Sequence, residues 1–231
     1  MRYLIAFFVV IMALAGYQIV RIACVTQKVS YTQTPFERIR PHAKLKILFL
    51  GDSTAVGTGA LNNTESVPGR FGQDFPEAHI RNISRNGRKL KDVIENFPTA
   101  EDHYDLVVIQ AGSNDIMRLT PLKTVEKNLA LLIDKAKLVG DRVIMLHSGD
   151  VGAAPVFSWP LNGLFSLRTR AVRQIYINAA QEKGVIYVDL YKIRTDNIFL
   201  KDTKNFYSAD LLHPSGAGYG VWYEHIRFSL L

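Results

Sequence analysis

Short apolar runs alternate with helical patterns along most of this chain, and this alternation constrains its fold more than any other feature. From Leu45 onward, five apolar runs are typical of buried strands, at residues 47–50, 79–83, 106–109, 142–146 and 185–188. Between the strands, apolar side chains recur at helical spacing, first at Leu90, Val93, Ile94 and Phe97. Strands that are apolar on both faces and alternate with helices predict a five-stranded parallel sheet in a three-layer α/β/α sandwich.

A long helical pattern begins beside a proline. Thr120 is expected to cap this helix with Pro121 at its start, a position where the missing amide hydrogen of proline costs nothing. Apolar residues then repeat at helical spacing, at Leu122, Val125, Leu129, Leu132, Ile133 and Ala136. Another helix is indicated by Ala171, Ile175, Ile177 and Ala180. The chain after residue 45 shows no internal repeat and no second domain boundary.

The net charge of +7 is concentrated at the N-terminus. Residues 1–46 hold one acidic side chain, Glu37, against seven basic ones, Arg2, Arg21, Lys28, Arg38, Arg40, Lys44 and Lys46. The remaining 185 residues therefore carry a net charge of only +1. Binding to nucleic-acid phosphates needs a concentrated basic face, so no nucleic-acid partner is expected. A single cysteine excludes a disulfide framework and Cys-rich metal sites.

The N-terminal segment is also strongly apolar. The 18 residues from Tyr3 to Val20 carry no charge, and Gln18 is their one strongly polar side chain. At about 1.5 Å per residue, a helix of this length just crosses the hydrocarbon core of a membrane. It could be a signal peptide cleaved after Ala13-Leu14-Ala15, or an uncleaved anchor. Because apolar character continues past this site, we expect an anchor over residues 1–25 and a juxtamembrane linker over residues 26–45.

The side of the membrane on which the domain lies is a separate question. Arg2 precedes the apolar segment, whereas Arg21, Lys28, Arg38 and Arg40 follow it, and the positive-inside rule would then place the domain in the cytoplasm. The signal-like N-terminus argues for the opposite side. We expect a membrane-anchored protein whose domain, residues 46–231, is extracytoplasmic, in the periplasm or at the cell surface. The basic residues between 21 and 46 would then lie against anionic lipid headgroups.

Polar residues follow the predicted strands. These segments are Gly51-Asp52-Ser53, Asn86-Gly87, Gly112-Ser113-Asn114-Asp115 and His147-Ser148-Gly149-Asp150, and Asp210-Leu211-Leu212-His213 follows near the end of the chain. In an open parallel sheet, ligands bind beyond the carboxyl ends of the strands. We therefore expect these segments to meet at one edge of the sheet and to form one site there.

Five residues in these segments suit acyl transfer. A serine hydroxyl is a poor nucleophile until a neighbouring base takes its proton, and His213 can be that base for Ser53. Asp210, three residues before His213, can hold the other imidazole nitrogen. Backbone N–H groups of Ser53 and Gly87 and the side-chain amide of Asn114 are candidate donors to the oxyanion. Each signal alone is more typical of a turn, a helix cap or a structural role than of catalysis, but their order after successive strands favours an active site.

These segments resemble the sequence blocks of the SGNH (GDSL-type) hydrolases, a family of serine esterases and lipases. The matching blocks are Gly51 to Gly59, Asn82 to Gly87, Gly112 to Asp115 and Asp210 to His213. The resemblance spans residues 46 to about 220 and implies a flavodoxin-like α/β fold. It also implies Ser53 as nucleophile, Asp210 and His213 as its partners, Gly87 and Asn114 as oxyanion donors, and no cofactor. Thr54 stands where the family often has an aliphatic residue, which does not affect the mechanism.

Two further segments are candidate walls of a substrate pocket. His147, Ser148 and Asp150 follow the fourth strand and either line the pocket or belong to an ordinary polar loop. The stretch from Val151 to Phe165, with Phe157 and Trp159, is unusually apolar for a loop. It is either a lid or acyl-binding wall, or a loop packed on the sheet edge or near the membrane. Trp222 and Tyr223 are expected to pack a C-terminal helix.

Together these features predict a membrane-anchored serine hydrolase that cleaves carboxylic esters through an acyl-enzyme intermediate. Its substrate would be a small-molecule, lipid or acylated-glycan ester, and neither a metal nor a cofactor is expected. An O-acyltransferase or deacetylase acting on cell-envelope glycans would use the same residues. A glycan- or lipid-binding module without turnover is the alternative from another class. The sequence leaves the acyl chain length and the oligomeric state open.

Overall fold

The computed structural model describes residues 2–26, 34–98 and 102–230. Its centre is a five-stranded sheet in the order β2-β1-β3-β4-β5, in which every neighbouring pair is parallel. The strands are β1 (Lys46–Gly51), β2 (His79–Asn82), β3 (Tyr104–Gln110), β4 (Gly140–Leu146) and β5 (Ile186–Tyr187). This confirms the predicted parallel sheet. The strand order is the flavodoxin-like one: from β1 the chain adds β2 on one side and then β3, β4 and β5 on the other, so the order switches between β1 and β3.

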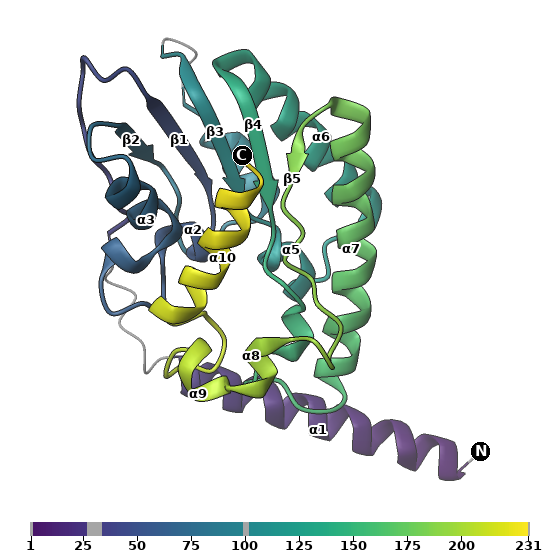
Figure 1. The fold of residues 1–231 in the computed structure, drawn as a ribbon. Helices are drawn as coiled ribbons and strands as arrows, with labels where there is room; N and C mark the ends of the chain where they lie inside the picture. Colours follow the sequence, from purple (N-terminus) through teal and green to yellow (C-terminus); the bar gives the residue numbers. More distant parts are fainter. Residues whose placement is uncertain (1, 27–33, 99–101, 231) are drawn as a thin grey trace.

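Helices cover both faces of the sheet, as Figure 1 shows. They are α2 (Ser53–Val56), α3 (Val67–Asp74), α4 (Leu90–Glu95), α5 (Ser113–Met117), α6 (Leu122–Val139), α7 (Leu161–Lys183), α8 (Ile198–Lys201), α9 (Thr203–Phe206) and α10 (Gly216–Phe228). Short 3₁₀ turns, η1 (Asn63–Glu65) and η2 (Val151–Ala153), join them. One core lies between the sheet and α4, α6 and α7, and the other between the sheet and α3 and α10. The three-layer sandwich is therefore confirmed.

The strands are apolar throughout because each face of the sheet meets a helical layer. In β1, Leu48 and Leu50 face the core of α4, α6 and α7, whereas Ile47 and Phe49 face the core of α3 and α10. All four side chains are at most 1% exposed. The period-2 alternation of a strand sends neighbouring residues to opposite faces, so a strand between two helical layers reads as a continuous apolar run.

The predicted cap of the long helix is wrong by one residue. Helix α6 begins at Leu122, its N-cap is Pro121, and no side chain caps it. The Thr120 N–H instead donates to the backbone carbonyl of Asp115 at 3.0 Å, and the buried Asp115 carboxylate accepts the Leu90 N–H at 2.9 Å. This backbone bond ties Thr120 to α5, so the long helix begins one residue later than predicted.

The N-terminal segment forms one helix, α1 (Arg2–Thr26). Within it, Arg2–Cys24 has a mean hydropathy of 2.2, is long and apolar enough to cross a membrane, and is only 7% buried. Figure 1 shows α1 running past the end of the domain that carries α8 and α9. Of the predicted linker, residues 27–33, with Lys28, lie outside the described residues. Its remainder packs on the domain, where Arg38 pairs with Ile80 of β2 through bonds of 2.9 and 2.8 Å.

Candidate active site

Ser53 stands at the turn between β1 and the short helix α2. Asp52 forms the N-cap of this helix, and its Oδ1 accepts the Thr54 N–H at 2.9 Å and the Thr54 hydroxyl at 2.7 Å. This cap fixes the sharp turn that follows the strand. Because β1 and β3 are the strands at which the sheet order reverses, Ser53 lies at the crevice where ligands bind in such sheets.

His213 connects Ser53 to a buried carboxylate. Its Nε2 lies 2.9 Å from the Ser53 Oγ, and its Nδ1 lies 2.5 Å from the Asp210 Oδ2. The structure thus brings together three side chains that the sequence analysis selected from the two ends of the domain. An imidazole that shares Nδ1–H with a carboxylate presents its free Nε2 lone pair to the serine hydroxyl.

The turn before His213 is built around Asp210. This side chain is fully buried, and its Oδ1 accepts the Ser208 hydroxyl at 2.6 Å and the Leu212 and His213 N–H groups at 2.9 Å each. Burial alone would raise the pKa of Asp210, but the hydrogen bond and charge of His213, with the other donors, hold it down at about 2. Asp210 therefore carries a negative charge at neutral pH, directed at the imidazole.

A glycine allows the Ser53 and His213 segments to pack closely. Gly59, three residues after α2, has a φ of +101°, and a Cβ atom there would lie 2.5 Å from the Pro214 carbonyl oxygen and 2.9 Å from the His213 Cβ. Any side chain at this position would push the two segments apart and would strain the backbone. The close approach of the two ends of the domain thus depends on this glycine.

Gly87 and Asn114 lie in the two neighbouring loops. Gly87 follows β2 with a φ of +77°, as expected for a turn glycine, and Asn114 is in the first turn of α5 after β3. The Asn114 Nδ2 donates to the Arg88 carbonyl at 3.1 Å, which joins these two loops. Thr58, just after α2, donates its hydroxyl to the Asn86 Oδ1 at 2.8 Å, which joins the β2 loop to the serine segment.

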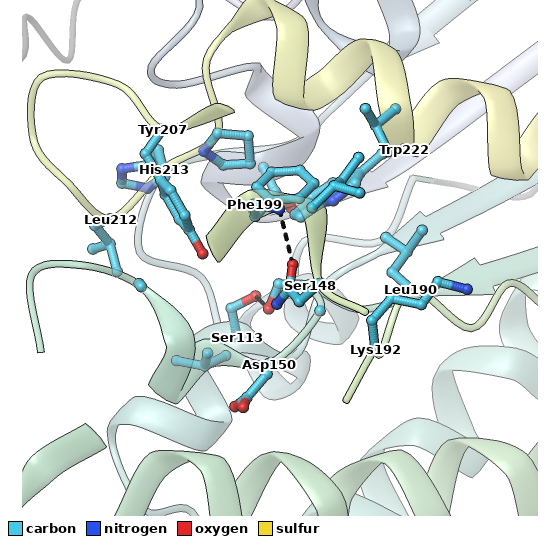
Figure 2. A pocket seen from close by; sticks show the side chains of 18 of the residues that line it. Ser113, Ser148, Asp150, Leu190, Lys192, Phe199, Tyr207, Leu212, His213 and Trp222 are labelled. Carbon is cyan, nitrogen blue, oxygen red and sulfur yellow. Dashed lines mark hydrogen bonds between the residues drawn. The ribbon is translucent and has the colours of Figure 1, made fainter. Parts of the chain in front are cut away.

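A cavity of about 160 Å³ opens beside Ser53 and His213. Figure 2 shows that its walls differ in character. Serine and aspartate side chains form one side, where the Ser113 and Ser148 hydroxyls share a hydrogen bond of 2.9 Å and Asp150 lies next to them. The other walls are mainly apolar, from Leu190, Phe199, Tyr207, Leu212 and Trp222. In this view Trp222 lies across the cavity from His213.

Asp150 alone of the four tentative substrate-binding residues lines this cavity. His147, Phe157 and Trp159 do not line it, which corrects that expectation. Phe157 turns into the core, where its ring meets that of Phe165 at 4.8 Å. Trp159 is 57% exposed on the outside of the domain. The apolar stretch also ends as a helix rather than a loop, because residues 161–165 are the start of α7.

His147 is buried behind the cavity, with 1% of its surface exposed. Its Nε2 lies 3.0 Å from the Tyr187 hydroxyl, its Nδ1 is bonded to the Ser148 carbonyl, and the Tyr176 ring packs edge-on against it. Burial lowers the pKa of His147 to about 4, so the ring is neutral at pH 7. Its neutral ring holds the backbone of Ser148, the residue that does reach the cavity.

Sequence reasoning missed most of the apolar wall. Phe199 and Tyr207 come from the segment between β5 and α10, which has no helical or strand periodicity. The cluster of aromatic residues just before Asp210 is the signal that could have found them. Trp222 does pack α10, as expected, but its ring also lines the cavity.

Among residues 2–26, 34–98 and 102–230, no group of three or more His, Cys, Asp or Glu side chains could hold a metal ion. The hydrogen bonds described above place a serine, an imidazole and a carboxylate in series, with loop donors beside them. This combination can activate a hydroxyl nucleophile and stabilise a tetrahedral oxyanion.

Solved structures resemble this fold at low sequence identity. A structure of a protein named TesA has 22% identity and a TM-score of 0.64, over 80% of this chain and 97% of that one. A lipase/acylhydrolase from Enterococcus faecalis has 24% identity and a TM-score of 0.60, over 79% and 93%. Axe2, an acetyl xylan esterase from Geobacillus stearothermophilus, has 24% identity and a TM-score of 0.55, over 81% and 94%. These likenesses show the shared fold.

No curated protein sequence matches the chain. The profile of the GDSL-like Lipase/Acylhydrolase family, in contrast, matches residues 49–221, which include Ser53, Asp210, His213 and the loops of Gly87 and Asn114. The match runs from the end of β1 into α10 and so covers most of the chain. The chain belongs to the GDSL-like lipase/acylhydrolase family.

Proposed function

We propose that this protein is a serine ester hydrolase that works through an acyl-enzyme intermediate. The observation that carries the proposal is the hydrogen-bonded series of Ser53, His213 and Asp210 beside a cavity with mainly apolar walls. The family includes lipases and acylhydrolases, which supports an acylated substrate.

The chemistry follows from the positions of the protons. His213 Nε2 takes the Ser53 proton as the Oγ attacks the ester carbonyl, and Asp210 stabilises the imidazolium that forms. The N–H groups of Ser53 and Gly87 and the amide of Asn114 donate to the oxyanion. His213 then gives its proton to the departing alcohol. Water, activated by the same imidazole, attacks the acyl-enzyme, releases the acid and restores the serine.

The cavity is the proposed site of the acyl chain. Its apolar side chains favour a hydrocarbon over a charged group, because burial removes apolar surface from water. Trp222 lies across the cavity from His213 in Figure 2, and we expect its ring to limit the length of the acyl chain. Trp222→Ala should move the preferred chain of p-nitrophenyl esters to greater length, by kcat/KM over a series from acetyl upward. A wild-type preference for acetyl would instead favour a deacetylase.

The central test uses Ser53. Ser53→Ala should abolish hydrolysis of a short p-nitrophenyl ester and labelling by a fluorophosphonate, which reacts only with an activated serine. Circular dichroism of the same variant checks that the fold is intact. Thr64→Ala, on the exposed η1 turn, is a control that should label normally. Unchanged turnover in Ser53→Ala would sink the assignment.

We further propose that α1 anchors the protein in a membrane, with the domain of residues 46–231 on the extracytoplasmic side. The length and exposure of Arg2–Cys24 support an anchor, although a signal sequence has the same properties. Fusing alkaline phosphatase or a cytoplasmic fluorescent protein to the C-terminus tests on which side of the membrane the domain lies. Active phosphatase supports the proposal, and fluorescence alone would place the domain in the cytoplasm.

A further inference from the structure

The one strongly polar residue of the apolar N-terminal segment has partners in the domain. Gln18 is only 4% exposed, although it lies on a helix whose other described side chains are mostly exposed. Its Nε2 donates to the Trp159 carbonyl, and its Oε1 accepts the Ser158 N–H at 3.0 Å. The amide therefore pairs in both directions with the backbone of a loop 140 residues away.

Arg21, one turn further along α1, contacts the same loop. Its Nη1 donates to the Val156 carbonyl at 3.3 Å and to the Ser158 Oγ at 3.2 Å. Ile22 packs against the core beside them. We call Gln18, Arg21 and residues 156–159 the latch. Residues 18 and 21 lie on one side of a helix, so the latch fixes both the position and the rotation of α1.

The latch connects α1 to the catalytic turn through a single residue. The Val156 carbonyl accepts from Arg21, and the Val156 N–H donates to the Leu211 carbonyl at 3.0 Å. Leu211 lies between Asp210 and His213. The loop that holds the anchor therefore also holds the turn that presents the imidazole to Ser53.

Exposed apolar side chains lie in the latch and in the helix that follows it. Trp159 is 57% exposed, Leu164 is 42% exposed and Leu167 is 60% exposed. The two leucines are three residues apart in the first turns of α7 and so share a face. Figure 1 shows this end of α7 beside α1. Tryptophan is enriched where hydrocarbon meets headgroups, because its ring is apolar and its N–H is polar.

We propose that the domain docks on the lipid surface through Trp159, Leu164 and Leu167, held there by the latch. The inference rests on the proposed anchor and deepens it. If α1 lies in lipid, Arg21 marks the level of the headgroups, and Gln18 lies about 4.5 Å deeper at 1.5 Å per residue. The Trp159 backbone, bonded to Gln18, lies at that depth. An unpaired amide at that depth is costly, which favours the latched state.

The two tryptophans of the chain allow a direct test. In Trp222→Phe the only tryptophan is Trp159, and in Trp159→Phe it is Trp222, which is 6% exposed inside the domain. The full-length variants are reconstituted in phosphatidylcholine vesicles with or without bromine atoms on the acyl chains near the headgroups. We expect brominated lipid to quench at least half of the Trp159 emission and to leave that of Trp222 nearly unchanged. Equal, weak quenching of both would overturn docking.

A second pair of variants tests the latch, in the Trp222→Phe background. Gln18→Leu keeps α1 apolar but removes both amide bonds, and should reduce Trp159 quenching at least twofold. Tyr17→Leu, an exposed neighbour, should leave it unchanged. Unaltered quenching in Gln18→Leu would overturn the role of the latch.

Sedimentation of the vesicles separates this inference from the anchor on which it rests. Protein that fails to sediment with the vesicles would overturn the anchor and the docking together. Protein that sediments without Trp159 quenching would overturn docking alone. Ser53→Ala should behave like wild type in both measurements, so loss of the proposed hydrolysis leaves this test intact.

Discussion

Two histidines, His213 and His147, lie near the same edge of the sheet and form similar hydrogen bonds through Nε2. His213 Nε2 lies 2.9 Å from a serine hydroxyl, and His147 Nε2 lies 3.0 Å from the Tyr187 hydroxyl. A carboxylate is near each ring, Asp210 beside His213 and Asp189 at 3.4 Å from the Tyr187 hydroxyl. They differ in the partner of Nδ1, which is a carboxylate at His213 and the backbone carbonyl of Ser148 at His147.

This difference determines what each ring can do with a proton. An imidazole that gains a proton needs a negative charge nearby, and Asp210 supplies one in direct contact with His213. At His147, Asp189 is already paired with Arg173, whose Nε donates to it at 2.9 and 3.0 Å. His147 is also sealed from the cavity. A histidine near a hydroxyl is thus a candidate base only when it has both a charge partner and access to substrate.

The largest expected difference lies between the two histidines themselves. His213→Gln should reduce kcat/KM for a p-nitrophenyl ester by roughly 10⁴- to 10⁶-fold, because the serine loses its base. His147→Gln should keep kcat/KM within about threefold of wild type, since His147 touches no reacting atom. Equal losses in the two variants would contradict the comparison.

The two aspartates provide the next contrast. Asp210→Asn should lower kcat by about 10⁴-fold, because an amide neither fixes the correct tautomer of His213 nor stabilises its charge. Asp189→Asn removes the Arg173 pair and should change kcat by less than about threefold. Steady-state kinetics of both variants on one ester decide the matter. A larger loss in Asp189→Asn would move the catalytic charge to the His147 network.

Asn114 tests the oxyanion donors. Asn114→Ala should lower kcat by roughly 10²–10³-fold with little change in KM, because its amide acts on charge that develops in the transition state. Asn178→Ala, on the exposed side of α7, is the matched control. A change confined to KM would make Asn114 a substrate-binding residue only.

The smallest expected effect concerns stability and pH. Burial lowers the pKa of His147 from 6.5 to about 4. As the pH falls, His147 therefore gains a proton in the unfolded chain at a higher pH than in the folded one. Its contribution to stability is complete above pH 6.5 and is lost as the pH falls to about 4. As the pH falls through this window, the free energy of unfolding of the wild type should fall by about 3 kcal/mol relative to that of His147→Gln. Urea unfolding at each pH measures this difference. A constant difference between the two proteins would mean that His147 is not held neutral.

The sequence was sufficient to predict the sheet and the residues at its edge, because both depend on local patterns. Strands buried on two faces read as apolar runs, and glycine-rich turns mark their ends. The selection of Ser53, Asp210 and His213 followed from their order after those strands. Their mutual distances did not, since these depend on how Gly59 lets distant segments meet.

The failures share a physical cause, which is that the partners of a side chain are set by packing outside the local pattern. Thr120 could cap α6, but its N–H is bonded to the Asp115 carbonyl and the helix begins one residue later. Phe157 and Trp159 are two residues apart in one apolar stretch, yet one turns into the core and the other outward. Trp222 packs α10 as predicted, but its ring also lines the cavity, which the helical pattern could not show. A local pattern can show that a side chain is apolar but not which of several apolar environments it enters.

The contact of Gly59 with the His213 turn has a consequence for the timing of activity. Ser53 and His213 are 160 residues apart, so synthesis delivers the nucleophile long before its base. A partly synthesised chain that has folded around Ser53 lacks the proposed base until residues 208–214 are made and pack against Gly59. Under the proposed mechanism, ester hydrolysis therefore cannot begin during synthesis before residues 208–214 have been made and packed.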